Sequence, residues 1–99
     1  MSENTPTLVV NMRGGTRYDI YIGRPSKWGN PYSHLPTSIP GVTRVATREE
    51  AVDRYRIWIK AQPRLLASLH ELKGKILGCH CSEYVPCHGH VLAEMADAL

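Results

Sequence analysis

The hydrophobic pattern near the amino terminus is that of two short strands. Residues 8–12 form an apolar run interrupted only by Asn11, and apolar and polar positions alternate over residues 18–22. Both patterns are typical of β-strands. Because Gly14-Gly15 between them is a strong turn signal, the sequence predicts an antiparallel β-hairpin over residues 8–22.

Helical periodicity begins at residue 47. Thr47, followed three residues later by Glu50, forms a capping box and predicts the start of a helix over residues 47–62. Apolar residues then recur at helical spacing, and five charged residues lie off that stripe, namely Arg48, Asp53, Arg54, Arg56 and Lys60. We expect the apolar stripe to be buried and the charged side to be solvated. The stripe consists of Ala51, Val52, Tyr55, Trp58 and Ile59.

Two more helices and a third strand are predicted in the remaining sequence. Pro63 suits the first turn of a second helix, whose leucines are buried and which ends at Gly74. Residues 75–78 form a short strand. A last helix begins at Cys87 or His88. Its apolar face consists of Val91, Leu92, Met95 and Leu99.

The predicted elements indicate one small α/β or α+β domain. A β-hairpin and a third short strand pack with about three helices over residues 7–99, and residues 1–6 are expected to be a disordered terminus. Residues 23–41 contain four prolines and three glycines without periodicity. They are predicted to form a long loop, and loops of this length within a compact domain are usually functional.

Composition narrows the class of protein. The hydrophobic fraction of 42% is ordinary for a globular chain, and the net charge of +3 permits contact with phosphates without requiring it. No run approaches the roughly 18 apolar residues of a membrane span, and the polar start lacks a secretory signal. We therefore expect a cytoplasmic protein. Its three cysteines, an odd number, argue against a disulfide framework.

The segment GCHCSEYVPCHGH, residues 78–90, contains every cysteine of the chain. Zinc prefers four thiolate or imidazole ligands in a tetrahedron. Cys79 and Cys81 lie at the end of a predicted strand, and Cys87 and His90 share a face in the first turn of the last helix. These four side chains are the predicted zinc ligands, with His88 as the alternative to His90. The metal would staple the strand to the helix.

Two other interpretations of this segment stay open. Cys87 at a helix amino terminus could be a catalytic nucleophile, with His88 or His90 as its base. If only the cysteines bound zinc, a water in the fourth position could be activated, with Glu83 nearby as a base. Alternatively, the cysteines are reduced core residues beside solvated histidines.

The segment GRPSKWGNP, residues 23–31, is the second candidate site. Arg24 and Lys27 would bind phosphate, Trp28 would stack on a base, and Asn30 would position polar groups. Further polar contacts would come from the end of the first strand, through Asn11 and Arg13. The alternative is that Trp28 anchors the loop to the core and the prolines shape its turns.

Nearly the whole chain resembles a family of small phage and bacterial proteins, domain-of-unknown-function family 4326. The resemblance rests on VVNMR, YIGRPSKWGNPY, REEAVDRYRIWI, LKGKILGCHC and PCHGHVLAEMA. It implies a stand-alone small domain that is often encoded by phages, but no activity. Cys79, Cys81, Cys87 and His88 match the family pattern. His90 stands where that pattern has aspartate, and either residue could bind zinc.

The leading hypothesis is a zinc-binding module that engages a nucleotide, a nucleic-acid phosphate or a host protein. One alternative is an enzyme acting on nucleotides or bases through Cys87 or a zinc-bound water. Another is a protein-interaction module that contacts no phosphate. No membrane partner is expected.

Overall fold

The computed structural model describes residues 6–11, 15, 17–24, 26–36, 40–79 and 87–99. Within these residues the chain is an α+β domain with three α-helices and short strands. The predicted disordered terminus covers residues 1–6, and of these only residue 6 lies within the described residues. None of the helices in the described ranges combines the length and apolar character needed to cross a bilayer.

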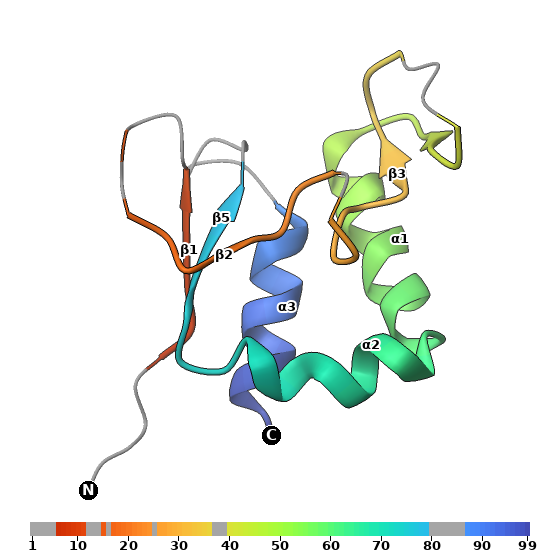
Figure 1. The fold of residues 1–99 in the computed structure, drawn as a ribbon. Coiled ribbons are helices and arrows are strands. Elements are labelled where there is room, and N and C mark those ends of the chain that lie inside the picture. Colours follow the sequence, from red (N-terminus) through yellow and green to blue (C-terminus); the bar gives the residue numbers. More distant parts are fainter. Residues whose placement is uncertain (1–5, 12–14, 16, 25, 37–39, 80–86) are drawn as a thin grey trace, which may run out of the picture.

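The main sheet has three parallel strands in the order β1-β5-β2 (Figure 1). Strand β1 is Leu8–Asn11, β2 is Ile20–Tyr21 and β5 is Ile76–Cys79. The register places Leu8 beside Ile76 and Asn11 beside Cys79, while Tyr21 lies beside Gly78. The predicted hairpin is therefore wrong. β1 and β2 run in the same direction, and β5 lies between them and takes the hydrogen bonds that a hairpin would have formed.

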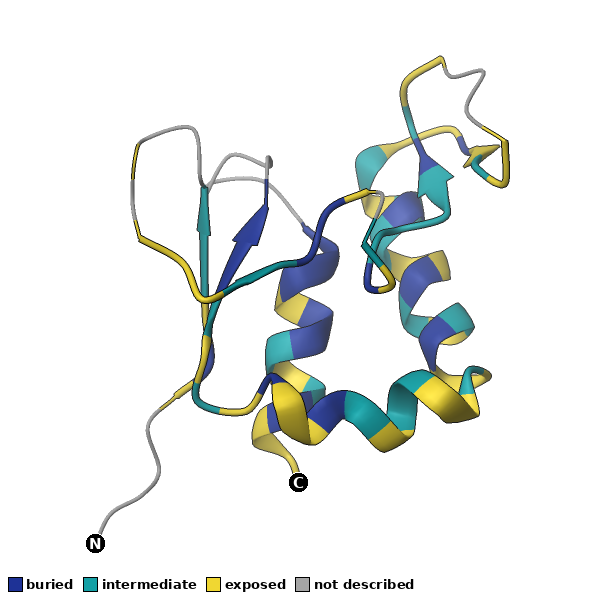
Figure 2. Ribbon diagram, viewed as in Figure 1, coloured by how far each residue is buried: buried dark blue, intermediate teal, exposed yellow. Residues whose placement is uncertain are grey.

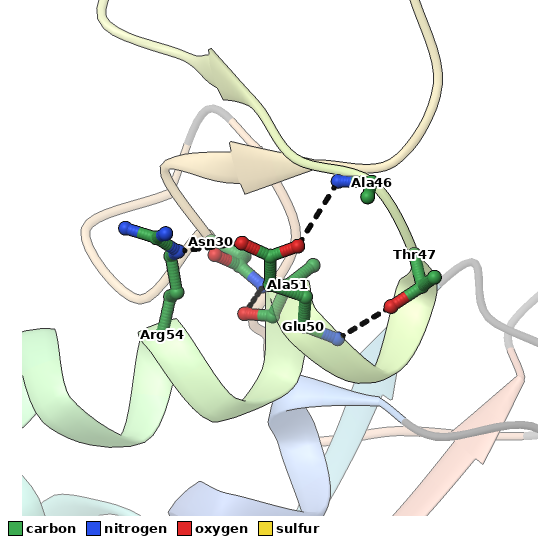
Figure 3. Close-up of polar contacts among 6 residues, drawn as sticks. All are labelled: Asn30, Ala46, Thr47, Glu50, Ala51 and Arg54. Carbon is green, nitrogen blue, oxygen red and sulfur yellow. Dashed lines mark hydrogen bonds and ion pairs between the residues drawn. The ribbon is translucent and has the colours of Figure 1, made fainter.

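The starts of the helices were predicted to within one residue, but the first two helices end before their predicted last residues, the second by the larger margin. Helix α1 is Arg48–Lys60, and its N-cap Thr47 accepts a hydrogen bond from the Glu50 amide, as in the predicted capping box (Figure 3). Helix α2, Pro63–Ser68, continues into a 3₁₀ turn, Leu69–Glu71. Helix α3 is His88–Asp97, with Cys87 as its N-cap. Local capping chemistry and periodicity determine these boundaries.

The predicted long loop contains strand structure of its own. β3, Tyr32–Ser33, pairs in parallel with β4, Thr43–Arg44, and this small pair lies beside the amino-terminal end of α1 (Figure 1). The Thr43 amide donates to the carbonyl of Pro31, just before β3, and the Val45 amide, just after β4, donates to the carbonyl of Ser33. The described residues of the segment 23–30, which are 23–24 and 26–30, contain no regular strand or helix. They connect the main sheet to this pair.

The core lies between the sheet and the helices. α1 and α3 stand side by side, α2 runs across one end of both, and α3 covers one face of the sheet (Figures 1 and 2). The closest approach is at Gly89, where a Cβ would lie 2.8 Å from Ile22 and 2.9 Å from Val9. Glycine therefore lets the first turn of α3 approach β1 and the residue that follows β2. Among the described residues, the largest fully buried side chains are those of Ile22, Tyr55, Ile59, Leu72, Leu77, Val91 and Leu92.

Hydrogen bonds of Thr7 at the other end of α3 hold the helix beside the start of β1. The Thr7 hydroxyl donates to an Asp97 carboxylate oxygen at 2.6 Å, and the Thr7 amide approaches both carboxylate oxygens at 3.2 Å. The same hydroxyl accepts from the Gly74 amide at 2.9 Å. α3 is thus fixed to the sheet at both of its ends.

Candidate functional site

The parallel sheet brings three distant parts of the chain to one edge. β1 ends at Asn11 and β5 at Cys79, which are paired in register. The residue after β2, Ile22, donates its amide to Gly78 of β5 at 3.0 Å. The amino terminus of α3 meets the same edge (Figure 1). Ligands of open parallel sheets bind at the carboxyl ends of the strands, so this edge is the candidate site.

Two cysteine thiols lie together at this edge. The Sγ atoms of Cys79 and Cys87 are 3.4 Å apart, and both residues are buried. Neither is in a disulfide. Cys87 Sγ also accepts a hydrogen bond from the Gly89 amide at 3.4 Å, as the N-cap of α3. The end of the central strand and the start of a helix therefore position the two sulfurs against each other.

His88 contributes an imidazole beside the thiols. Its Nε2 lies 2.8 Å from the Ile22 carbonyl oxygen, and its Nδ1 lies 3.9 Å from Cys87 Sγ. Because a carbonyl only accepts, Nε2 must carry the hydrogen. In a neutral His88 the other nitrogen, Nδ1, is then unprotonated, and its lone pair is free to accept a proton or bind a metal ion. This arrangement is typical of metal-binding histidines, which donate their second nitrogen to a carbonyl or carboxylate.

Burial keeps His88 neutral. Desolvation is the largest cause that lowers its pKa, and the charges of Arg24 and His90 lower it further. The hydrogen bond to Ile22 and the charge of Cys79 act in the opposite direction without outweighing burial. A neutral imidazole is the form that binds metal ions and accepts protons.

The sheet edge that carries Cys79, Cys87 and His88 is called the thiol edge. Tyr55 of α1 connects this thiol edge to the loop of residues 23–30. Its hydroxyl donates to the Trp28 carbonyl at 2.7 Å, and its ring meets His88 edge-on at 4.9 Å between centroids. Burial, followed by the charge of Cys87, raises the pKa of Tyr55 well above its usual range. The hydroxyl therefore stays protonated and acts as a fixed donor. The sequence placed Tyr55 on the buried stripe, but periodicity carries no signal for the contacts of its hydroxyl.

Trp28 anchors the loop. Its side chain is only 3% exposed and belongs to the core cluster. The ring therefore offers no open face for stacking on a base. Of the two interpretations drawn from the sequence, the structure favours the one in which Trp28 holds the loop to the core.

Asn30 has a structural role as well. Its Nδ2 donates to the Ala51 carbonyl of α1 at 3.1 Å (Figure 3). Its Oδ1 accepts from the Tyr32 amide at 2.9 Å. Both ends of the amide are thus engaged within the protein. Asn30 fixes the loop to the first turn of α1.

The two cations of the loop are exposed but differ in their surroundings. Lys27 Nζ lies 3.2 Å from Glu71 and 5.3 Å from the centre of the Trp28 ring. Arg24 donates through Nη1 to the Asn30 carbonyl at 2.8 Å. Arg24 acts on the pKa of His88, so it is the loop cation that the structure relates to the thiol edge.

The predicted site residues thus separate into two groups. The structure brings Cys79, Cys87 and His88 together, and it places Asn11 at the same edge of the sheet. His90 is exposed on α3. Cys81, Glu83 and Arg13 lie outside the described residues. Among the residues that the structure does describe, no three His, Cys, Asp or Glu side chains are arranged as a metal site.

Comparison with known proteins gives a family and no function. Searches of curated proteins and of solved structures found no match. A family model described as a domain of unknown function, DUF4326, matches residues 10–98. This range includes the thiol edge, the loop of residues 23–30 and every helix. The chain therefore belongs to the DUF4326 family.

Proposed function

We propose that the chain is a zinc-binding module whose ligands are Cys79, Cys87 and His88. Cys81, two residues after Cys79 in the sequence, would be the fourth ligand. The observation that carries this proposal is the contact of two buried thiols beside an imidazole that is already hydrogen-bonded through its far nitrogen. Thiolate and neutral imidazole are the donors that tetrahedral zinc prefers.

The distances fit such a donor set. Zn–S bonds of about 2.3 Å in a tetrahedron separate two sulfurs by about 3.8 Å, and a Zn–N bond of about 2.05 Å puts sulfur and nitrogen about 3.6 Å apart. The Cys79 and Cys87 sulfurs are 3.4 Å apart, and Cys87 Sγ is 3.9 Å from His88 Nδ1. Shifts of about 0.3 to 0.4 Å would bring both pairs to these values, which side-chain rotation can supply.

His88 rather than His90 would bind the metal. His88 is buried at the first helical position after Cys87, while His90 points into solvent. The Ile22 carbonyl fixes the ring and would increase the basicity of Nδ1. A bound zinc would join the end of β5 to α3 and, through Ile22, to the start of the loop of residues 23–30. This fits a structural metal in a small domain.

Elemental analysis of reduced protein supplied with zinc tests the proposal. We expect one zinc per chain. His88→Ala should weaken zinc binding by more than about 100-fold, because removing even an outer partner of a ligand costs 10- to 100-fold. His90→Ala is the matched control and should retain the metal. Folded, reduced wild-type protein that takes up no zinc would overturn the proposal, as would loss of zinc in the His90 variant alone.

A second candidate function is binding of a nucleotide or nucleic-acid phosphate at the same edge. It is favoured by the position of the edge at the carboxyl ends of parallel strands and by the exposed Arg24 beside it. With Trp28 and Asn30 engaged in the fold, phosphate binding would rest on Arg24 and Asn11.

Titration with nucleotides and short oligonucleotides at two salt concentrations tests phosphate binding. We expect affinity that falls as salt rises and that Arg24→Ala weakens. Arg64→Ala, which removes an exposed cation from α2, should leave the affinity unchanged. Equal losses in both variants would indicate general charge attraction, and absence of binding at low salt would remove the candidate.

A further inference from the structure

The two thiols that touch at the sheet edge can also react with each other. We propose that Cys79 and Cys87 form a reversible dithiol–disulfide redox site, whose oxidant is a hydroperoxide such as hydrogen peroxide. This activity goes beyond metal binding. It requires only the two sulfurs, so it can be tested on protein freed of metal.

Geometry carries the proposal. The sulfurs are 3.4 Å apart, and a disulfide needs about 2.05 Å, so bond formation requires them to approach by about 1.4 Å. The strand and the helix that carry the two sulfurs already pack against each other. Cys79 ends the central strand, Cys87 caps α3, and α3 packs closely against the strands at Gly89. Reaction within the chain would therefore be favoured over reaction between two chains.

The roles of the two sulfurs follow from their surroundings. Cys87 Sγ accepts the Gly89 amide hydrogen at the start of α3, and a helix amino terminus favours negative charge on sulfur. Cys87 is therefore the attacking sulfur, and Cys79 is the resolving one. Both residues are only 2% exposed, so a small oxidant is better suited to this site than a bulky disulfide.

The chemistry balances with one hydrogen peroxide. The Cys87 thiolate attacks one peroxide oxygen, the O–O bond breaks, and the departing hydroxide takes up a proton to become water, which leaves a sulfenic acid. The Cys79 thiol then attacks the sulfenic sulfur. The S–O bond breaks, the Cys79 proton leaves with the oxygen as a second water, and the S–S bond forms. The two thiols lose two electrons in total, and the peroxide gains them.

Peptide mapping can identify the bond. Residues 72–94 are bounded by Glu71 and Glu94 and are divided by Glu83, so a glutamate-specific protease separates peptide 72–83, with Cys79 and Cys81, from peptide 84–94, with Cys87. The experiment uses the full chain, freed of metal by a chelator and treated with hydrogen peroxide under native conditions. A bond from Cys87 to either other cysteine links the peptides, whereas a Cys79–Cys81 bond does not.

We expect the linked pair of peptides to become the major form after oxidation and to disappear after reduction, while the intact chain stays monomeric. Cys81→Ser should keep the link, and Cys79→Ser should lose it. Absence of the link in oxidised wild-type protein would overturn the proposal, and so would its loss in the Cys81 variant. The wild-type and Cys81 results decide the question even if the Cys79 variant does not fold.

The outcome is separable from that of the zinc proposal. A chain that takes up zinc but forms no linked peptide supports the metal site and refutes the redox site. A chain that forms the linked peptide but takes up no zinc supports the redox site and refutes the metal site. Elemental analysis and peptide mapping of one preparation therefore test the two proposals independently.

Discussion

Replacement of Tyr55 by alanine is expected to lower the free energy of unfolding by about 3 to 5 kcal/mol, the usual cost of truncating a buried aromatic side chain. Tyr55 is fully buried, and its ring contacts both Trp58 and His88. Its hydroxyl holds the Trp28 carbonyl. The substitution thus empties the core between α1 and α3 and releases the loop of residues 23–30. Urea denaturation followed by circular dichroism measures the loss.

Tyr55→Phe isolates the contribution of the hydroxyl. It should cost about 1 to 3 kcal/mol, because the buried Trp28 carbonyl would lose its partner. Tyr21→Phe is the matched control. The Tyr21 hydroxyl also donates to a backbone carbonyl, that of Arg24 at 2.7 Å, but in an exposed position where water can replace it. Equal costs in the two phenylalanine variants would contradict the anchoring role of Tyr55.

The stability of metal-free protein is expected to fall as the pH is lowered from 7 to 5. In the unfolded chain His88 has an ordinary pKa near 6.5 and takes up a proton over this range. In the folded protein burial lowers its pKa, so it takes up a proton less readily than in the unfolded chain. The unfolded state then binds more protons, and the free energy of unfolding decreases with falling pH, by up to about 1.4 kcal/mol per pH unit for this one group.

Urea denaturation at several pH values, with His88→Gln as the test variant, measures this slope. Glutamine cannot take up the proton, and its amide nitrogen can still donate to the Ile22 carbonyl. The slope should therefore decrease in this variant. His70→Gln, which replaces an exposed histidine on the 3₁₀ turn, is the control and should leave the slope nearly as in the wild type. An unchanged slope in the His88 variant would assign the pH dependence to other groups.

The helices could be predicted from the sequence because their signals are local. The Thr47 cap, Pro63 at a first helical turn and the apolar stripe of α1 each act within a few residues, and the structure confirms them. Strand pairing is different. The Gly14-Gly15 signal indicates that the chain can turn, but it carries no information about a third strand more than fifty residues later. β5 pairs with both β1 and β2, and it is the most deeply buried of the three strands.

The same distinction applies to the candidate site. Clustering in the sequence was enough to nominate Cys79, Cys81 and Cys87 with His90 or His88, and of these the structure brings Cys79, Cys87 and His88 together. The choice between His88 and His90 depends on which side of the first turn of α3 faces Ile22, and that contact joins residues 66 positions apart. For Trp28 and Asn30, the residue types suggested a ligand. Their partners turned out to be Tyr55, Ala51 and Tyr32 within the fold.

Because β5 lies between β1 and β2, the main sheet cannot begin to form during synthesis until residues 76–79 have left the ribosome. Of the strands that the structure describes, only β5 hydrogen-bonds to β1 and β2. α1 and α2 depend on nearby residues and can form earlier. The sheet therefore assembles late and through distant contacts, which slows folding. The nascent chain must meanwhile keep its first apolar strand from pairing with other polypeptides.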